Sequence, residues 1–107
     1  MWFSASVFMR RTSPDGLERP ELWEETILLI AATDEAAARA EAERLGRALE
    51  TTFSVMEGVG RVAWQFDRVA QVNEILAETL ENGTELFSRF MRGGEARSLA
   101  TPYNLDE

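Results

Sequence analysis

The most constraining feature of this chain is an alanine-rich segment, residues 33–49, with the sequence TDEAAARAEAERLGRAL. When it is placed on a helix at about 100° per residue, its apolar residues fall on one stripe. That stripe consists of Ala38, Ala42, Leu45, Ala48 and Leu49. Because alanine side chains are short, a helix with this stripe can approach a flat surface closely. We therefore predict a helix that packs on a β-sheet.

The ends and the outer side of this segment agree with a helix. Thr33 is the predicted N-cap, and Asp34 and Glu35 complement the positive end of the helix dipole. Glu41 projects toward the apolar stripe, and we expect it to reach past the sheet into water. The opposite side is predicted to be a solvated charged face. Its members are Glu35, Arg39, Glu43, Arg47 and Glu50.

Five segments have the alternation or the apolar character of β-strands. They are residues 2–10, 22–31, 51–57, 61–72 and 84–91. The first two segments flank TSPDGLERPE, whose residues favour a turn, and together they predict a hairpin with an extended loop. Arg68 interrupts the apolar face of the fourth, which indicates a bulge or a strand end. Asn73 as a cap and Asn82-Gly83 as a stop predict a short helix between them.

These elements predict one α+β domain over residues 1–91. Its expected form is a mostly antiparallel sheet of about five strands, with one main helix packed on one face and a short second helix. Residues 92–107 lose this periodicity, and we predict that they form a polar, mobile C-terminal tail.

The segment LWEETILLIAA, residues 22–32, raises the question of what covers the second face of the sheet. Beyond Thr26 both of its faces are apolar, and residues 2–10 repeat this pattern. One helix covers only one face, so the cover is the short helix with the tail, a second copy, or a different partner. An apolar sheet face rimmed by acids would be an interaction surface. The predicted interaction face consists of Trp2, Phe8, Trp23, Ile27 and Leu29.

The quoted segments resemble a known family in order and spacing. MWFSASV, LWEETILLIAATDEAAARAEAERLG, VAWQF and NGTELFSRFM are similar to motifs of the bacterial family catalogued as domain of unknown function 4288. The resemblance covers residues 2–91, and where the family continues its Trp-x-Phe strand with a small residue, this chain has Arg68. It implies the domain and its boundaries, and no activity. The most specific motif is matched by Gly83, Thr84, Glu85, Ser88, Arg89 and Phe90.

The composition limits the kinds of catalytic site and partner that this chain can have. The chain of 107 residues has no cysteine and no histidine, which excludes thiol nucleophiles, disulfides and histidine-based acid–base catalysis. We predict no catalytic residue, no metal site and no cofactor. A net charge of −8 disfavours nucleic acid, and no apolar stretch is long enough to predict a membrane span. The positive charges of the N-terminal segment follow its apolar part, unlike a secretory signal, so a cytoplasmic location is expected.

One polar cluster could carry chemistry. Carboxylates with a serine and an arginine could support acid–base work or bind a small ligand, or they could form ion pairs at a sheet surface. We expect Glu85 and Arg89 to share one strand face, whereas Glu24 and Glu25 point to opposite faces. The predicted polar cluster is Glu24, Glu25, Glu85, Ser88 and Arg89.

The sequence thus favours a non-catalytic, acidic protein-interaction module that self-associates through a sheet face and its acidic rim. Its partner is a protein or a second copy in a homodimer, with no nucleic acid and no membrane. Two alternatives stay open. One is a small-ligand-binding protein or enzyme that uses the Glu/Arg cluster. The other is an immunity or accessory protein that binds a basic toxin, since acidic charge speeds encounter with a cationic partner.

Overall fold

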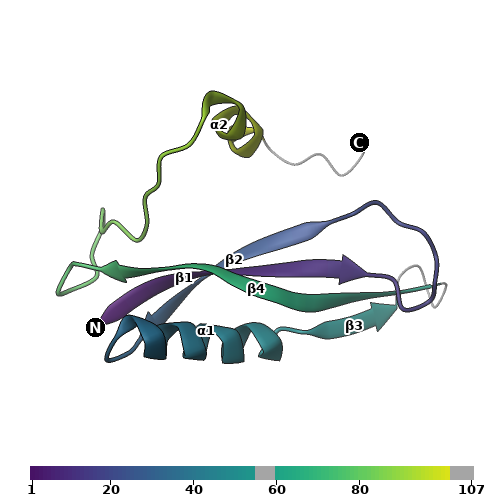
Figure 1. Ribbon diagram of the computed structural model, residues 1–107, viewed down its shortest axis with the longest axis horizontal. Helices are drawn as coiled ribbons and strands as arrows, with labels where there is room; N and C mark the ends of the chain where they lie inside the picture. The colour runs from purple at the N-terminus through teal and green to yellow at the C-terminus, as the bar shows by residue number, and fades with distance from the viewer. Residues whose placement is uncertain (55–59, 102–107) are drawn as a thin grey trace.

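The chain folds into a four-stranded antiparallel sheet with two helices, in a computed structural model that describes residues 1–54 and 60–101 (Figure 1). The elements are β1 (Trp2–Thr12), β2 (Trp23–Ala31), α1 (Glu35–Ala48), β3 (Thr51–Ser54), β4 (Arg61–Ile75) and α2 (Gly93–Ala100). The strand order is β2-β1-β4-β3, so β1 and β4 are central. The predicted α+β class is confirmed, but the described residues form four strands where about five were expected.

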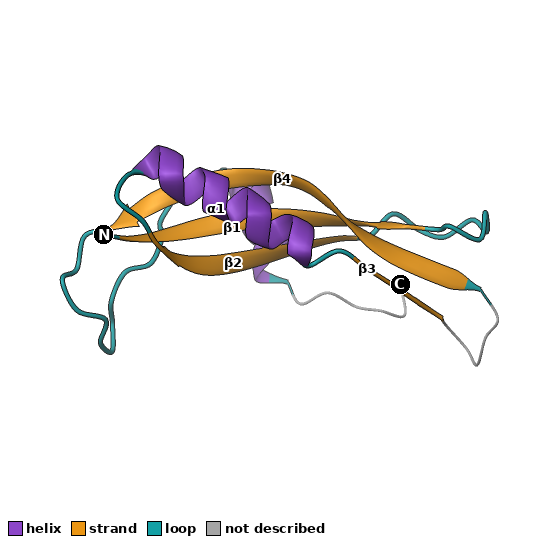
Figure 2. Ribbon diagram, turned by 90° about the horizontal axis from the view of Figure 1, so that it is seen from below, coloured by secondary structure: helices purple, strands orange, loops and turns teal. Residues whose placement is uncertain are grey.

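Helix α1 packs on one face of this sheet, as its alanine stripe predicts (Figure 2). Ala38 and Ala42 are fully buried against the odd-numbered side chains of β1. The N-cap is Asp34 and not Thr33, because the Asp34 carboxylate accepts a hydrogen bond from the Ala37 N–H at 2.7 Å. Glu41 extends into solvent, where it pairs with an arginine three residues on. The core comprises Phe3, Ala5, Val7, Met9, Ile30, Ala38, Ala42, Val69 and Val72.

Strand β4 keeps its apolar residues on the α1 side by means of two bulges. Met9 lies opposite Phe66 and Phe8 opposite Arg68, which leaves Asp67 as an inserted residue. A second register shift, between Ser6 and Val7 of β1, leaves Ala70 inserted. Each insertion moves the following residues to the other face, so the second restores the phase that the first changed. The bulge that Arg68 predicted is therefore present, and Arg68 itself points away from the core.

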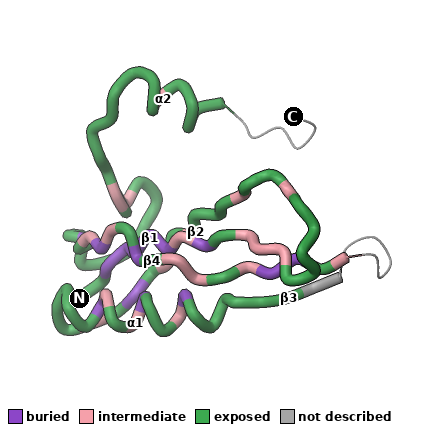
Figure 3. Tube along the Cα trace, turned by 45° about the vertical axis from the view of Figure 1, so that its right-hand side comes forward, coloured by how far each residue is buried: buried purple, intermediate pink, exposed green. Residues whose placement is uncertain are grey.

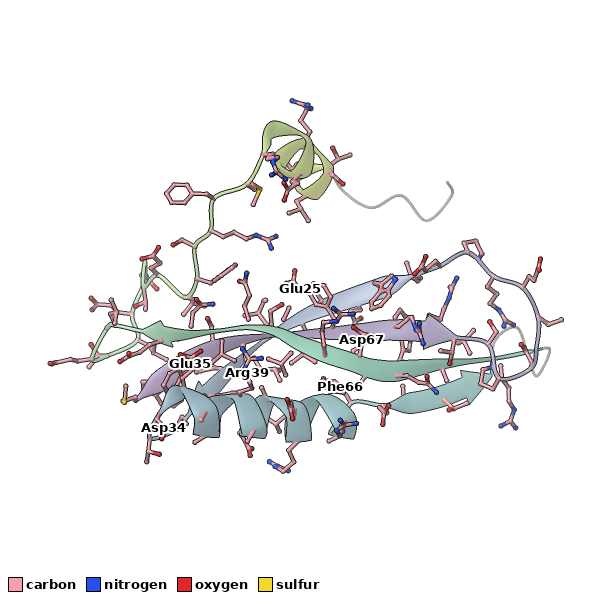
Figure 4. All side chains as sticks on the ribbon, viewed as in Figure 1. Glu25, Asp34, Glu35, Arg39, Phe66 and Asp67 are labelled. Atoms are coloured by element: carbon pink, nitrogen blue, oxygen red, sulfur yellow. The ribbon has the colours of Figure 1, made fainter. Side chains whose placement is uncertain are left out.

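Charged residues of the helical segment support these bulges. The Arg39 guanidinium donates a hydrogen bond to the Val69 carbonyl at 3.1 Å, and the Glu50 carboxylate accepts one from the Phe66 N–H at 3.0 Å. The Arg47 guanidinium lies 4.9 Å from the centre of the Phe66 ring. Figure 4 shows Arg39 and Phe66 between α1 and β4. Arg47 and Glu50 are exposed, as the predicted solvated face requires, whereas Arg39 is half-buried because it donates to a backbone carbonyl of the bulged stretch.

The short helix predicted over residues 73–83 is absent. β4 continues through this region to Ile75, because Asn73 and Ile75 pair with Ser4 and Trp2 of β1. Nonlocal strand pairing here overrides the local helix signals. Residues 76–83 then turn back, with Gly83 at a φ of 90° that favours glycine.

The predicted last strand, residues 84–91, has no regular secondary structure and joins no ladder. The Ser4 hydroxyl donates a hydrogen bond to the Leu86 carbonyl at 2.6 Å, which places this segment above β1. β1 already pairs with β2 and β4, so no ladder position is free beside it. The segment does not pair with the outer edge of β2 or β3 either, so the sheet has four strands among the described residues.

The remaining differences concern the end of β3 and the C-terminal segment. β3 ends at Ser54, and residues 55–57 of that prediction lie outside the described residues. The segment predicted as a polar tail contains α2. Within the described residues α2 contacts none of the strands and not α1, and it is exposed over most of its length (Figure 3).

Candidate functional site

The open face is the face of the sheet opposite α1, and it carries all five residues of the predicted interaction face. Even-numbered residues of β1 and odd-numbered residues of β2 point to it, since paired residues in an antiparallel ladder share a side. Trp2 and Trp23 are 38% and 40% exposed, and Ile27 and Leu29 are each 48% exposed. Phe8 is half-buried between Glu25 and Arg68. Local alternation brings these side chains together as the sequence predicts.

The middle of the open face is polar and built on short side chains. Ser4 and Ser6 are buried at the centre of β1, flanked by Leu29 and Ile27 on β2. The Ser6 hydroxyl donates a hydrogen bond to the Glu25 carboxylate. Beside Ser6, the Gln71 side-chain oxygen is buried and accepts no hydrogen bond from the described residues.

Two hollows lie along this face. The aromatic hollow, of about 440 Å³, is lined by Phe8, Trp23 and the bulged stretch 67–70 of β4. Its outer wall is reinforced by the Arg10 guanidinium, which lies 5.8 Å from the centre of the Trp23 ring. The second hollow, of about 540 Å³, lies between the end of β4 and residues 85–88. The bulges therefore shape the first hollow, which explains why no local sequence signal points to it.

The charges around the aromatic hollow balance, although the whole chain has a net charge of −8. Arg10 and Arg68 point to the open face there, and Glu25 is their acidic neighbour. Asp67 pairs with Arg68 at 2.5 Å and lines the aromatic hollow. Two carboxylates are thus matched by two arginines at this hollow, whereas Glu74 and Glu85 line the second hollow.

The predicted polar cluster is not assembled. Glu24 points to the α1 side of the sheet and Glu25 to the open face, as alternation requires. Glu85 and Ser88 line the second hollow with Asn73 and Glu74, at the far end of β4. Arg89 forms no ion pair with Glu85, and its guanidinium lies 5.9 Å from the Phe87 ring centre. Among residues 1–54 and 60–101, no group of three or more acidic residues could hold a metal ion.

A clasp that the sequence did not predict fixes the loop between β1 and β2. The Asp15 carboxylate accepts hydrogen bonds from the Arg19 guanidinium at 2.8 and 2.9 Å, from the Leu17 N–H at 3.0 Å, and from the Arg61 N–H. The Arg19 hydrogen bonds hold the pKa of Asp15 well below its ordinary value. The only local signal was the turn sequence Pro14-Asp15-Gly16, in which Asp commonly bonds a backbone N–H two residues on.

Comparison with known proteins places the chain in a family. No helix among the described residues is long and apolar enough to cross a membrane. No curated protein and no solved structure matches the chain. A family match described as Domain of unknown function (DUF4288) covers residues 2–88, from the start of β1 to the segment above it. The chain therefore belongs to the DUF4288 family.

Proposed function

We propose that this chain is a non-catalytic protein-interaction module that self-associates through its open face. The observation that carries the proposal is the set of five large apolar side chains that β1 and β2 present opposite α1. Trp2, Trp23, Ile27 and Leu29 are each more than one third exposed. Exposed apolar groups that gather on one face of a small domain are typical of interaction sites.

The charge distribution supports a second copy as the partner. Two copies with a net charge of −8 each repel one another over most of their surfaces. The part of the open face around the aromatic hollow is the exception, because it presents Arg10 and Arg68 together with Glu25 and Asp67. A two-fold axis brings residues of this part against different residues of its copy, so arginines of one copy can meet carboxylates of the other. A basic partner would gain little from the balanced charge around this hollow.

Composition supports a cytoplasmic setting for this module, since the chain uses no cysteine.

A second candidate function rests on the hollow at the end of β4. Its volume of about 540 Å³ is in the range of small-ligand sites, and Asn73, Glu85 and Ser88 supply polar groups. A small polar ligand there would be held by two acids, Glu74 and Glu85, and would therefore be neutral or cationic. This site is separate from the open-face aromatics, so the two functions can be tested independently.

The test is the molar mass in solution, by light scattering, over a dilution series. The variant Ile27→Glu places a charge in the centre of the open face, and Leu17→Glu is its matched control. Leu17 is 53% exposed in the loop after β1, outside the open face. Burying the exposed half of one isoleucine contributes about 0.7–1.5 kcal/mol, and a symmetric dimer contains it twice. Removal of both contributions corresponds to a rise in the dimer Kd of about 10- to 150-fold.

Two different results would contradict this proposal. A wild-type chain that stays monomeric at every concentration would end the proposal. A dimer that is weakened equally by Ile27→Glu and Leu17→Glu would move the interface away from the open face.

A further inference from the structure

The C-terminal arm, residues 88–100, leaves its own sheet. The hydrogen bond between the Ser4 hydroxyl and the Leu86 carbonyl ties the residues before the arm to β1. Beyond it the chain rises from the open face, and α2 stands apart from the sheet (Figure 1). The Phe90 side chain is fully exposed, and Met91 and Leu99 are 41% and 60% exposed. Exposed aromatic rings often bind in a pocket, and in the described part of this chain no pocket holds the Phe90 ring.

Helix α2 lacks the length to stand alone. It has eight residues and begins with Gly93 and Gly94, whereas isolated helices shorter than about 12–15 residues are marginal in water. Its side-chain support is the long ion pair between Arg92 and Glu95, at 3.8 Å with both groups largely exposed, and the hydrogen bond from the Thr101 hydroxyl to the Arg97 carbonyl at 2.7 Å. Ala96, Leu99 and Ala100 form an apolar side at i,i+3,i+4 spacing. Such a helix needs a surface to pack on, and the described part of its own chain supplies none.

The open face offers a surface of the right kind. The aromatic hollow, about 440 Å³ between Phe8, Trp23 and the bulged stretch of β4, has room for a phenylalanine ring. The buried Gln71 oxygen next to it lacks a donor among the described residues. Residues 88–91 of the arm carry backbone N–H groups that join no ladder, and such groups are suitable donors.

The size of the open face indicates that the arm of a second copy occupies it. β1 has 11 residues. At about 3.3 Å per residue and about 4.8 Å between strands, three strands present about 500 Å². A stable interface commonly buries about 800 Å² per partner. Contact between two open faces alone would therefore bury less area than a stable interface commonly does. An arm that reaches from each copy onto the other supplies the missing area.

We propose that the arm of one copy packs across the open face of a second copy and inserts Phe90 into the aromatic hollow. This inference rests on the proposed self-association and specifies its geometry. Exchange of arms makes the contact reciprocal, so each copy gives one Phe90 and receives one.

Disulfide trapping tests this geometry in the full chain, which has no cysteine of its own. Ala70 lines the aromatic hollow and is exposed, so Ala70→Cys places a thiol at its rim. This variant is mixed with a size-tagged Phe90→Cys variant, oxidised and analysed by non-reducing electrophoresis. We expect a mixed disulfide of intermediate size. A mixture of Leu17→Cys with the same partner is the matched control, and we expect no comparable product.

Two further measurements separate the possible failures. In the double variant Ala70→Cys/Phe90→Cys, a disulfide within one chain would overturn the inference, because the arm would then cover its own sheet. Phe90→Ser is expected to raise the dimer Kd at least about 100-fold, because two rings are lost per dimer. A wild-type dimer whose Kd is unchanged by Phe90→Ser, with no mixed disulfide, would overturn the arm exchange and leave the proposed function standing. A monomeric wild type would overturn both.

Discussion

Replacement of Gly46 by alanine tests how closely α1 lies on the sheet. A Cβ atom built at Gly46 would lie 2.6 Å from Cδ2 and Cε2 of Phe66 and 3.0 Å from Cγ1 of Val7. Two effects oppose one another. Alanine is favoured over glycine inside a helix by about 1 kcal/mol, whereas an extra carbon in a packed core costs about 1–3 kcal/mol.

The structure indicates which effect prevails. Val7 is fully buried, so it cannot move away, and the Phe66 ring is in contact with the Arg47 guanidinium, 4.9 Å from the ring centre. The ring would have to move by about 1 Å to restore ordinary contact, so the packing cost should lie in the upper half of its range. We expect Gly46→Ala to lower the free energy of unfolding by about 1–2 kcal/mol.

Urea denaturation followed by tryptophan fluorescence measures this difference, with Phe66→Leu and the double variant completing a mutant cycle. The smaller leucine side chain in place of the Phe66 ring should remove most of the clash, so Gly46→Ala should cost less in that background. A stabilisation of about 1 kcal/mol by Gly46→Ala alone, as at an exposed helix position, would refute the close approach.

Two further predictions concern the supports of the loop and the bulge. Because the folded-state pKa of Asp15 is depressed, its contribution to stability is present above its unfolded value of 3.8 and is lost as the pH falls below it. We expect the urea midpoints of wild type and Asp15→Asn to differ at neutral pH and to converge in strong acid; a gap that is constant with pH would contradict this interpretation. Arg39→Met removes the donor to the Val69 carbonyl and should cost about 1 kcal/mol in urea denaturation. Arg44→Met is the control, because Arg44 is 66% exposed and pairs with Glu41 at the surface, and an equal effect of the two variants would refute the role of Arg39.

The structural features that depend on local periodicity were predictable from the sequence. The alanine stripe of α1 and the alternation of β1 and β2 each follow from side-chain spacing along one element. The five residues of the interaction face share a side for the same reason. The charge at Arg68 also marked a bulge, because an arginine on the core face has no local alternative.

The sequence did not predict the structural features that depend on which segment lies beside an element. Residues 73–75 have helix signals, but β1 offers them a strand partner. Residues 84–91 alternate like a strand, yet they lie above β1, whose two ladder positions are filled. The polar cluster required this missing strand to bring Glu85 and Arg89 near β2. The aromatic hollow depends on a second bulge, at Ala70, for which the side chains give no signal.

The paired bulges of β4 also have a genetic meaning. Deletion of Asp67 alone should leave every other residue of β4 on its present face, because Phe66 and Arg68 would then be consecutive and would still lie opposite Met9 and Phe8. Deletion of Ala70 should be accommodated in the same way, since its two neighbours already lie opposite consecutive residues of β1. Deletions at these two positions should therefore be tolerated far better than deletions at regular ladder positions, which move the residues on one side of the deletion to the other face. The double deletion would have a straight strand without the aromatic hollow.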